Sequence, residues 1–278
     1  MTAAPQPPMV LAQQSCSELA SVLNDIELVL IPIGSTEQHG PNLGLGQDHL
    51  IAQAFCELAA ERLRPRLLST PAIPWGISDH HMNFPGSMTL RPETFLDLLE
   101  DVINSLVHHG LRRFLLVNGH GGNKALAGAA IQDFGMRLDV DFVGAVSHGM
   151  LDPEEAQASI RGDLPTGHAD EFETSYSYYL DPTLVREGAL VRAEMDERFY
   201  AFRMKLADFD LEWPNPECAL TRNGALGDAT RGTREAGEAL IEGAIAELGE
   251  MVGFLREHAP RWNGPPNGQL RWGRRERG

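Results

Sequence analysis

The residues best suited to chemistry fall in three short polar segments of the 278-residue sequence. The first segment contains Glu37, His39 and, further on, Asp48, the second is a glycine-rich turn around His120, and the third opens with His168. Carboxylate and imidazole groups contributed together from separate segments are the ligands that zinc, manganese and iron(II) take in proteins. The pattern therefore indicates a metal site, in which the two oxygens of Asp48 could bridge two ions.

Each of these residues also has a simpler interpretation. Asp48 stands just before a helical pattern and could serve only as a helix N-cap. A lone Glu-x-His segment is usually a solvated loop, and His120 could do no more than complete a turn. Glu37 and His39 are two residues apart, however, which places both side chains on one side of an extended segment.

The elements that must position these residues follow from the hydrophobic pattern. Continuous apolar runs predict strands buried on both faces, and periodic segments with capping residues predict helices. The expected strands cover residues 27–33, 67–70, 113–118 and 141–146, and the expected helices cover 15–23, 49–64, 92–109, 124–138, 168–179 and 230–256. Strands that alternate with helices predict βαβ units, a mostly parallel sheet and helices on both of its faces.

Two of the polar segments directly follow expected strands. Glu37 and His39 come after the strand at 27–33, and His120 comes after the strand at 113–118. Open α/β sheets build their sites in the loops beyond the carboxyl ends of the strands. This joint placement weakens the simpler interpretations, although spacing alone leaves the metal site and its alternatives about equally supported.

Composition excludes several classes of function. The chain has 39 Asp+Glu against 23 Lys+Arg and a formal net charge of −16, so it offers no basic footprint for nucleic acid or for an acidic membrane surface. No apolar run reaches the ~18–20 residues that span a bilayer, and the first basic residue is Arg62, so neither a membrane span nor a secretory leader is expected. The three cysteines form no CxxC pair, which predicts free thiols in a cytoplasmic protein.

The turn GHGGN has a second possible use. Backbone N–H groups of a glycine-rich turn between a strand and a helix suit an oxyanion or a phosphate. The turn is neither GxGxxG nor a Walker loop, so nucleotide binding is not favoured. The sequence also lacks GxSxG and HExxH, the common signatures of serine hydrolases and zincins, and the polar segments contain no cysteine nucleophile.

Four motifs in order resemble those of the creatininase (creatinine amidohydrolase) family. They are PIGSTEQHGP at 32–41 with Asp48 downstream, FPGS at 84–87, NGHGGN at 118–123 and HADEFETS at 168–175. The resemblance implies a three-layer α/β/α sandwich with a mostly parallel central sheet, assembled as a homohexamer. We expect one creatininase-like domain over 15–258, between a flexible lead-in at 1–14 and a C-terminal tail at 259–278.

The resemblance also implies a site with two divalent metal ions per subunit (zinc, manganese or iron) that hydrolyses C–N bonds in cyclic or other small amides. Glu37, His39, Asp48 and His120 fall on the family's metal ligands, with Asp48 at the bridging position. His168 falls on the histidine that acts near the scissile bond.

The sequence departs from the creatininase pattern at Gly122, where creatininase has a glutamate ligand. Glu173 is expected to take its place, whereas helical spacing alone would put Glu171 on the same face as His168. Creatininase also closes its pocket with tryptophans from the loop before the catalytic histidine, and residues 148–167 contain none. This difference argues against creatinine itself as the substrate.

The substrate side of the site is less sharply defined by the sequence. Ser78 falls near a family substrate-contacting position, and the backbone N–H groups of Gly121 and Gly122 would hold a developing oxyanion. Trp75 and Phe84 could wall the pocket or simply pack in their loop. One of His80 and His81 could contact the substrate, or the two could form a surface pair.

These features predict hydrolysis of a C–N bond in a small molecule by a hydroxide bridging two metal ions, with His168 carrying a proton to the leaving nitrogen. One alternative is a relative with shifted chemistry, such as a deformylase, a lactone or cyclic-ketone hydrolase, or a peptide-trimming enzyme. Another is a metal-bound small-molecule binding protein without turnover. The expected partners are a small-molecule substrate and further copies of the chain.

Overall fold

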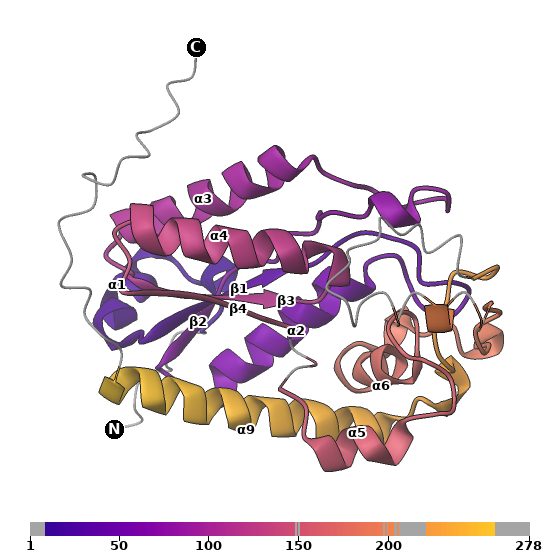
Figure 1. Ribbon diagram of the computed structural model, residues 1–278. Coiled ribbons are helices and arrows are strands. Elements are labelled where there is room, and N and C mark those ends of the chain that lie inside the picture. Colours follow the sequence, from indigo (N-terminus) through magenta and orange to yellow (C-terminus); the bar gives the residue numbers. More distant parts are fainter. Residues whose placement is uncertain are drawn as a thin grey trace.

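The computed structural model describes residues 9–258 apart from 148, 150, 197, 199, 203, 204 and 206–220. At its centre is a parallel sheet in the order β2-β1-β3-β4, formed by β1 (Leu28–Ile33), β2 (Leu67–Ser69), β3 (Arg113–Asn118) and β4 (Phe142–Ser147). Helices cover both faces of this sheet (Figure 1). The expected α/β/α sandwich with a parallel sheet is confirmed.

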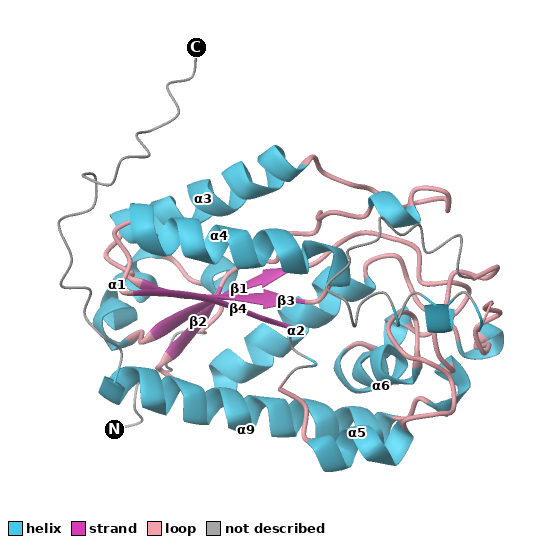
Figure 2. Cartoon of the chain, viewed as in Figure 1, coloured by secondary structure: helices cyan, strands magenta, loops and turns pink. Residues whose placement is uncertain are grey.

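The two faces of the sheet pack against different helices (Figure 2). One face packs on α3 (Pro92–His108) and α4 (Lys124–Arg137), and the other on α2 (Gln47–Arg62) and α9 (Arg234–His258). Alternate residues of β1 enter the two cores, because successive side chains of a strand point to opposite faces. All six residues of β1 are buried, which is why its sequence is a continuous apolar run.

Helix starts follow recognisable local chemistry. The capping box of Ser15 and Glu18 opens α1 (Cys16–Val22), and Pro92 occupies a first-turn position of α3. The carboxylate of Asp170 accepts hydrogen bonds from two backbone N–H groups in the first turn of α6 (Glu171–Leu180). The helix expected at 168–179 therefore begins three residues later than its sequence pattern indicates.

Three further expectations about helices need correction. The helix expected from 49 begins two residues earlier, so Asp48 lies inside the first turn of α2 and is not its N-cap. The helix expected at 230–256 begins at Arg234, because residues Ala229–Arg231 form a separate 3₁₀ turn. Residues 148–167, for which no element is expected, contain the short helix α5 (Glu154–Ile160).

The two ends of the chain were predicted to lie outside the domain. Within the lead-in expected at 1–14, Met9 and Val10 are buried, and Val10 forms an isolated bridge with Ser69 beside the sheet. The tail at 259–278 lies outside the described residues, as does Cys218. Cys16 and Cys56 are free thiols, and none of the helices within the described ranges is long and apolar enough to cross a membrane.

The connections after β1, β2 and β3 meet at one end of the sheet. The loop after β1 leads into α2, and a 3₁₀ turn at Gly121–Asn123 leads from β3 into α4. The long connection from β2 to α3 is pinned to the β1 loop by isolated bridges between Thr36 and Met88 and between Ile33 and Ile73. Three loops distant in sequence are thereby held together beyond the carboxyl ends of the strands.

Candidate metal centre

Five acidic and histidine side chains from four parts of the chain converge at this end of the sheet. Glu37 and His39 come from the loop after β1, Asp48 from the first turn of α2, His120 from the turn after β3 and Glu173 from the first turn of α6. The first four are almost completely buried, and Glu173 is partly buried. The structure thus brings together all five residues predicted as metal ligands.

Asp48 lies at the middle of this group. Its Oδ1 is 3.0 Å from Nε2 of His39, and its Oδ2 is 3.1 Å from Nδ1 of His120. On one side, Glu37 Oε1 is 3.1 Å from the same His120 nitrogen. On the other, Glu173 Oε2 is 3.6 Å from His39 Nε2. The arrangement has two halves that share Asp48, as the predicted bridging role requires.

Backbone carbonyls orient both histidines. Nε2 of His120 donates to the carbonyl of Ile77 at 2.8 Å, and Nδ1 of His39 donates to the carbonyl of Glu37 at 3.3 Å. Each ring therefore turns its other nitrogen toward Asp48. Metal-binding histidines in proteins are held in this way, because a hydrogen bond at one nitrogen fixes the tautomer that leaves the other free.

Three buried atoms of the group have no hydrogen-bond partner among the described residues. They are Glu37 Oε1, His39 Nε2 and Asp48 Oδ2. A buried polar atom without a partner is uncommon, because leaving it unpaired costs about 1–3 kcal/mol. Carboxylate oxygens and an imidazole nitrogen that face one another in this way fit the ligand chemistry of a divalent cation. The residues present therefore fit the metal that the sequence predicts.

The pKa values of His39 and Glu173 reflect the charged groups packed around them. Burial lowers the pKa of His39, but Asp48 and Glu173 more than offset this and raise it to about 10. Burial, together with Asp170 and Asp48, raises the pKa of Glu173 to about 8 although His39 opposes the shift. A proton on His39, or a cation in its place, would offset the repulsion between these carboxylates.

The structure distinguishes between the two glutamates of α6. Glu171 is completely buried and accepts the backbone N–H groups of Gly162 and Asp228, each at 2.8 Å. Its carboxylate is thus used to join two loops, whereas Glu173 faces His39. Glu173, not Glu171, stands in the group, as the sequence-based choice between them expected.

Gly122 has no space for the ligand that creatininase carries at this position. A Cβ atom there would lie 2.1 Å from the carbonyl oxygen of Ile77 and 2.4 Å from Nε2 of His120. A glutamate at position 122 would therefore break the hydrogen bond that orients His120. Glu173, from α6, lies instead in the half of the centre that contains His39.

His168, predicted to be catalytic, lies against the group. Its Nδ1 is 3.8 Å from Glu37 Oε1, and its ring centroid is 4.3 Å from that of His39. Burial and the neighbouring His39 and His81 hold the pKa of His168 well below its usual value. The lowered pKa favours the neutral ring.

The residues predicted on the substrate side of the site differ in their exposure to solvent. Ser78 is completely buried and donates to Glu37 Oε2 at 2.6 Å, so its hydroxyl orients a carboxylate. Gly121 is exposed in the 3₁₀ turn, and Trp75 is 45% exposed. The substrate contacts proposed for Ser78, Gly121 and Gly122 stay predictions.

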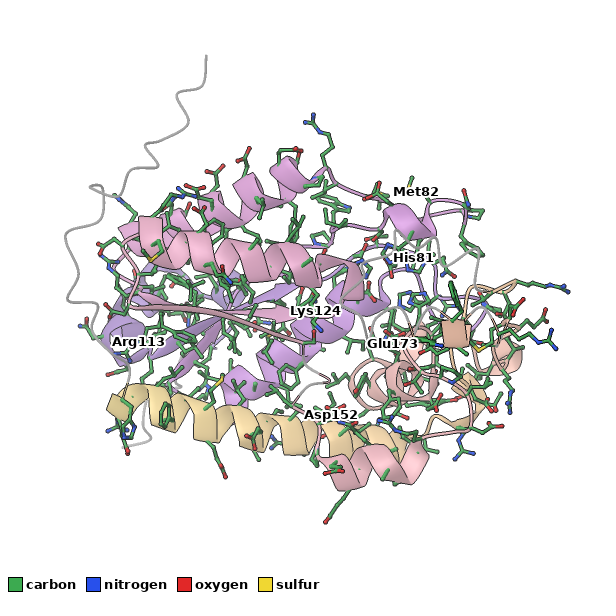
Figure 3. The ribbon with its side chains drawn as sticks, in the orientation of Figure 1. His81, Met82, Arg113, Lys124, Asp152 and Glu173 are labelled. Carbon is green, nitrogen blue, oxygen red and sulfur yellow. The ribbon has the colours of Figure 1, made fainter. Side chains whose placement is uncertain are left out.

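Two residues near the centre were not among the predicted site residues. His81, which is labelled in Figure 3, is buried with Nε2 3.2 Å from Glu37 Oε1. Its ring stacks on that of His168. Gln38 contacts both of these histidines. The pair His80-His81 was visible in the sequence, but nothing in its spacing distinguishes a buried histidine from a solvated one.

This chain is similar in sequence to known proteins. The family described as Creatininase: Creatinine amidohydrolase matches residues 12–252. The 3-dehydro-scyllo-inosose hydrolase of Thermotoga maritima is 27% identical over 262 residues, which cover 88% of this chain and 82% of that protein. The mycofactocin precursor peptide peptidase of Mycobacterium ulcerans is 31% identical over 253 residues, with coverage of 87% and 88%.

Solved structures share the fold. A creatininase described with Mn has a TM-score of 0.73 at 24% identity, covering 91% of this chain and 99% of that chain. A creatininase variant of Zn–Zn type has a TM-score of 0.72, also at 24% identity, over 91% and 99%. The family match extends over nearly all of the described residues, from the strand before Glu37 to the last long helix, and includes every side chain of the centre. This chain therefore belongs to the creatininase family.

Proposed function

We propose that this chain is a metal-dependent hydrolase that cleaves a C–N bond in a cyclic or other small amide. The observation that carries the proposal is the group of buried ligand atoms around Asp48, whose Oδ1 lies 3.0 Å from His39 Nε2 and whose Oδ2 lies 3.1 Å from His120 Nδ1. The relatives named above, which are hydrolases, support the reaction type.

Each half of the centre would hold one divalent ion. Glu37, Asp48 and His120 would provide the ligands of the first, and His39, Asp48 and Glu173 those of the second. Ions at such a site polarise a substrate carbonyl and lower the pKa of bound water toward ~7 in favourable zinc cases. Zinc or manganese would suit these ligands equally well.

Residues around the centre would orient its ligands and transfer protons. His168 lies beside the centre, with Nδ1 3.8 Å from Glu37 Oε1, and from there it would carry a proton to the leaving nitrogen. Ser78 holds Glu37 through its hydroxyl. The exposed turn at Gly121 and Gly122 would place backbone N–H groups toward the substrate carbonyl oxygen.

A peptide substrate is the second candidate. It is supported by the peptide peptidase relative, which matches 87% of this chain at 31% identity. The absence of tryptophan from residues 148–167 supports it as well, because a closed aromatic pocket suits a small ring better than a peptide.

A substrate panel separates the two candidates. The zinc-loaded and manganese-loaded protein would be assayed with creatinine, hydantoins, N-formyl amines, small lactones and short peptides, with released products followed by mass spectrometry. Hydrolysis of a cyclic or formyl amide that stops on chelation supports the first candidate, and hydrolysis of peptides alone supports the second. No turnover of any of these compounds by either metal form would contradict the proposal.

A further inference from the structure

The side chain of Gln38 is buried, and its orientation is fixed by two backbone groups. Its Oε1 accepts the N–H of Gly40 at 2.8 Å, and its Nε2 donates to the carbonyl of Gly224 at 2.9 Å. A backbone N–H can only donate and a carbonyl can only accept. These two contacts therefore determine which end of the amide is oxygen and which is nitrogen, an assignment that geometry alone often leaves open.

The fixed amide determines the tautomer of His81. The second hydrogen of Gln38 Nε2 has His81 Nδ1 as its acceptor, at 2.9 Å. Nδ1 must therefore carry the lone pair, and the hydrogen of the neutral ring is on Nε2. That nitrogen lies 3.2 Å from Glu37 Oε1. A nitrogen that carries a hydrogen has no lone pair for a metal, so His81 is excluded as a ligand.

The backbone of the same residue determines the tautomer of His168. The carbonyl of Gln38 is 2.7 Å from His168 Nε2, which must donate to it. The Gln38 amide nitrogen is also 3.0 Å from His168 Nε2, but both amide hydrogens are taken by Gly224 and His81. The lone pair of His168 is therefore on Nδ1, the nitrogen 3.8 Å from Glu37 Oε1.

We propose that Gln38 is a positioning residue that gives different roles to two stacked histidines. Their ring centroids are 4.4 Å apart, yet His81 presents a hydrogen toward Glu37 and His168 presents a lone pair toward the centre. The chemical role of His168 rests on the proposed function, whereas the two tautomers do not.

The proposal also excludes a competing metal site. Glu37, His81 and His168 offer atoms that all lie within 4.8 Å of one another, which by distance alone could hold an ion. Loss of the Gln38 amide hydrogen would free His81 to change tautomer and open this possibility. Gln38 would thus disfavour an ion held by Glu37, His81 and His168.

Nuclear magnetic resonance tests the tautomers directly. Long-range ¹H–¹⁵N correlation spectra of the histidine rings distinguish Nδ1–H from Nε2–H, and zinc-loaded protein gives diamagnetic spectra. Signals would be assigned by their loss in His81→Gln and His168→Gln. The expected result for the unaltered protein is a hydrogen on Nε2 and none on Nδ1 in both rings.

The variant Gln38→Glu keeps the shape of the side chain but has no hydrogen to donate. His81 is then expected to gain a hydrogen on Nδ1, and turnover is expected to fall about 10- to 100-fold, as for other residues that orient a metal site. Gln132→Glu, on the exposed surface of α4, adds the same charge and is expected to leave spectra and turnover unchanged.

A hydrogen on Nδ1 of either ring in the unaltered protein would overturn the proposal. So would a folded Gln38→Glu variant in which the His81 signals do not move. If that variant does not fold, the spectra of the unaltered protein still decide. If the two rings have the predicted tautomers but the protein hydrolyses nothing, this inference holds and the proposed function is wrong. If the protein hydrolyses a substrate but the rings have other tautomers, the proposed function holds and this inference is wrong.

Discussion

At the scale of single residues, both halves of the centre depend on Asp48, because one carboxylate oxygen faces each half. Asp48→Asn replaces one oxygen with an NH₂ group, which cannot bind a cation. We expect turnover to fall by more than about 100-fold, beyond the loss typical of residues that only orient a ligand, together with loss of bound metal. Asp101→Asn, on the exposed face of α3, is the control. Turnover that survives Asp48→Asn would show that the shared carboxylate is not needed.

The hydrogen bond from Ser78 to Glu37 allows a milder test. Ser78→Ala removes a 2.6 Å contact but no proposed ligand, so the affinity for zinc should fall about 10- to 100-fold with little change in fold. Competition with a chromogenic chelator measures that affinity. Ser105→Ala, an exposed serine on α3, is the control. Equal zinc affinity in both variants would mean that Ser78 does not position Glu37.

Some residue roles could be predicted from the sequence and others could not. The ligand candidates were recognised because Glu37, His39 and His120 follow apolar strands directly. The role of Gln38 could not be recognised from the sequence, because the orientation of its amide depends on Gly224, 186 positions further along the chain. The choice between Glu171 and Glu173 likewise depends on which carboxylate is taken up by distant backbone N–H groups, information that helical spacing does not contain.

At the scale of elements, the tight turn before α4 predicts that alanine substitution changes stability in opposite directions at two glycines. Gly122→Ala would place a Cβ atom 2.1 Å from the carbonyl of Ile77 and displace His120, so we expect a loss of about 1–3 kcal/mol in stability together with weaker metal binding. Gly128→Ala, inside α4 with nothing within 4 Å, should instead gain roughly 0.5–1 kcal/mol. Urea unfolding of the two variants measures both changes, and a Gly122→Ala variant as stable as Gly128→Ala would contradict the crowding seen at the turn.

Strands were easier to predict than helix boundaries. The expected strand at 113–118 has the observed bounds of β3, because an apolar run buried on both faces has few alternatives. The start of α6 was misplaced because the pattern at 168–179 looks helical throughout, while Asp170 caps the helix from an extended conformation. The seven-residue helix α5 was missed because it is too short to show a periodic pattern.

At the scale of the whole molecule, one buried acid makes stability depend on pH. Burial raises the pKa of Asp152 to about 6, against the opposing hydrogen bond from Tyr176, whereas an unfolded Asp titrates near ~3.9. A carboxyl whose folded pKa is raised stabilises the fold most below about pH 4, and that contribution is lost as pH rises through about 6.

Asp152→Asn imitates the protonated carboxyl at every pH. Its advantage in unfolding free energy should therefore be small near pH 4 and reach at most about 3 kcal/mol near pH 7. Urea unfolding at both pH values measures this difference, with the exposed Asp141→Asn as control. An Asp152→Asn variant that is no more stable than the unaltered protein near pH 7 would contradict the assignment.

The overall architecture was predictable because strands alternating with helices allow few arrangements, and four motifs in order pointed to one family. The substrate was not, because the residues that would contact it lie in loops, whose course depends on contacts across the molecule. Fold and ligand set therefore follow from the sequence more directly than the substrate does.

Metal stoichiometry tests the central claim most directly. Protein stripped of metal and titrated with zinc should bind two ions per chain, whereas Glu173→Gln should bind only one tightly, because Glu173 faces His39 in one half of the centre. Ion content after gel filtration, measured by mass spectrometry, gives both numbers. Saturation of the unaltered protein below one zinc ion per chain, or two equally tight ions in Glu173→Gln, would contradict a centre whose two halves share Asp48.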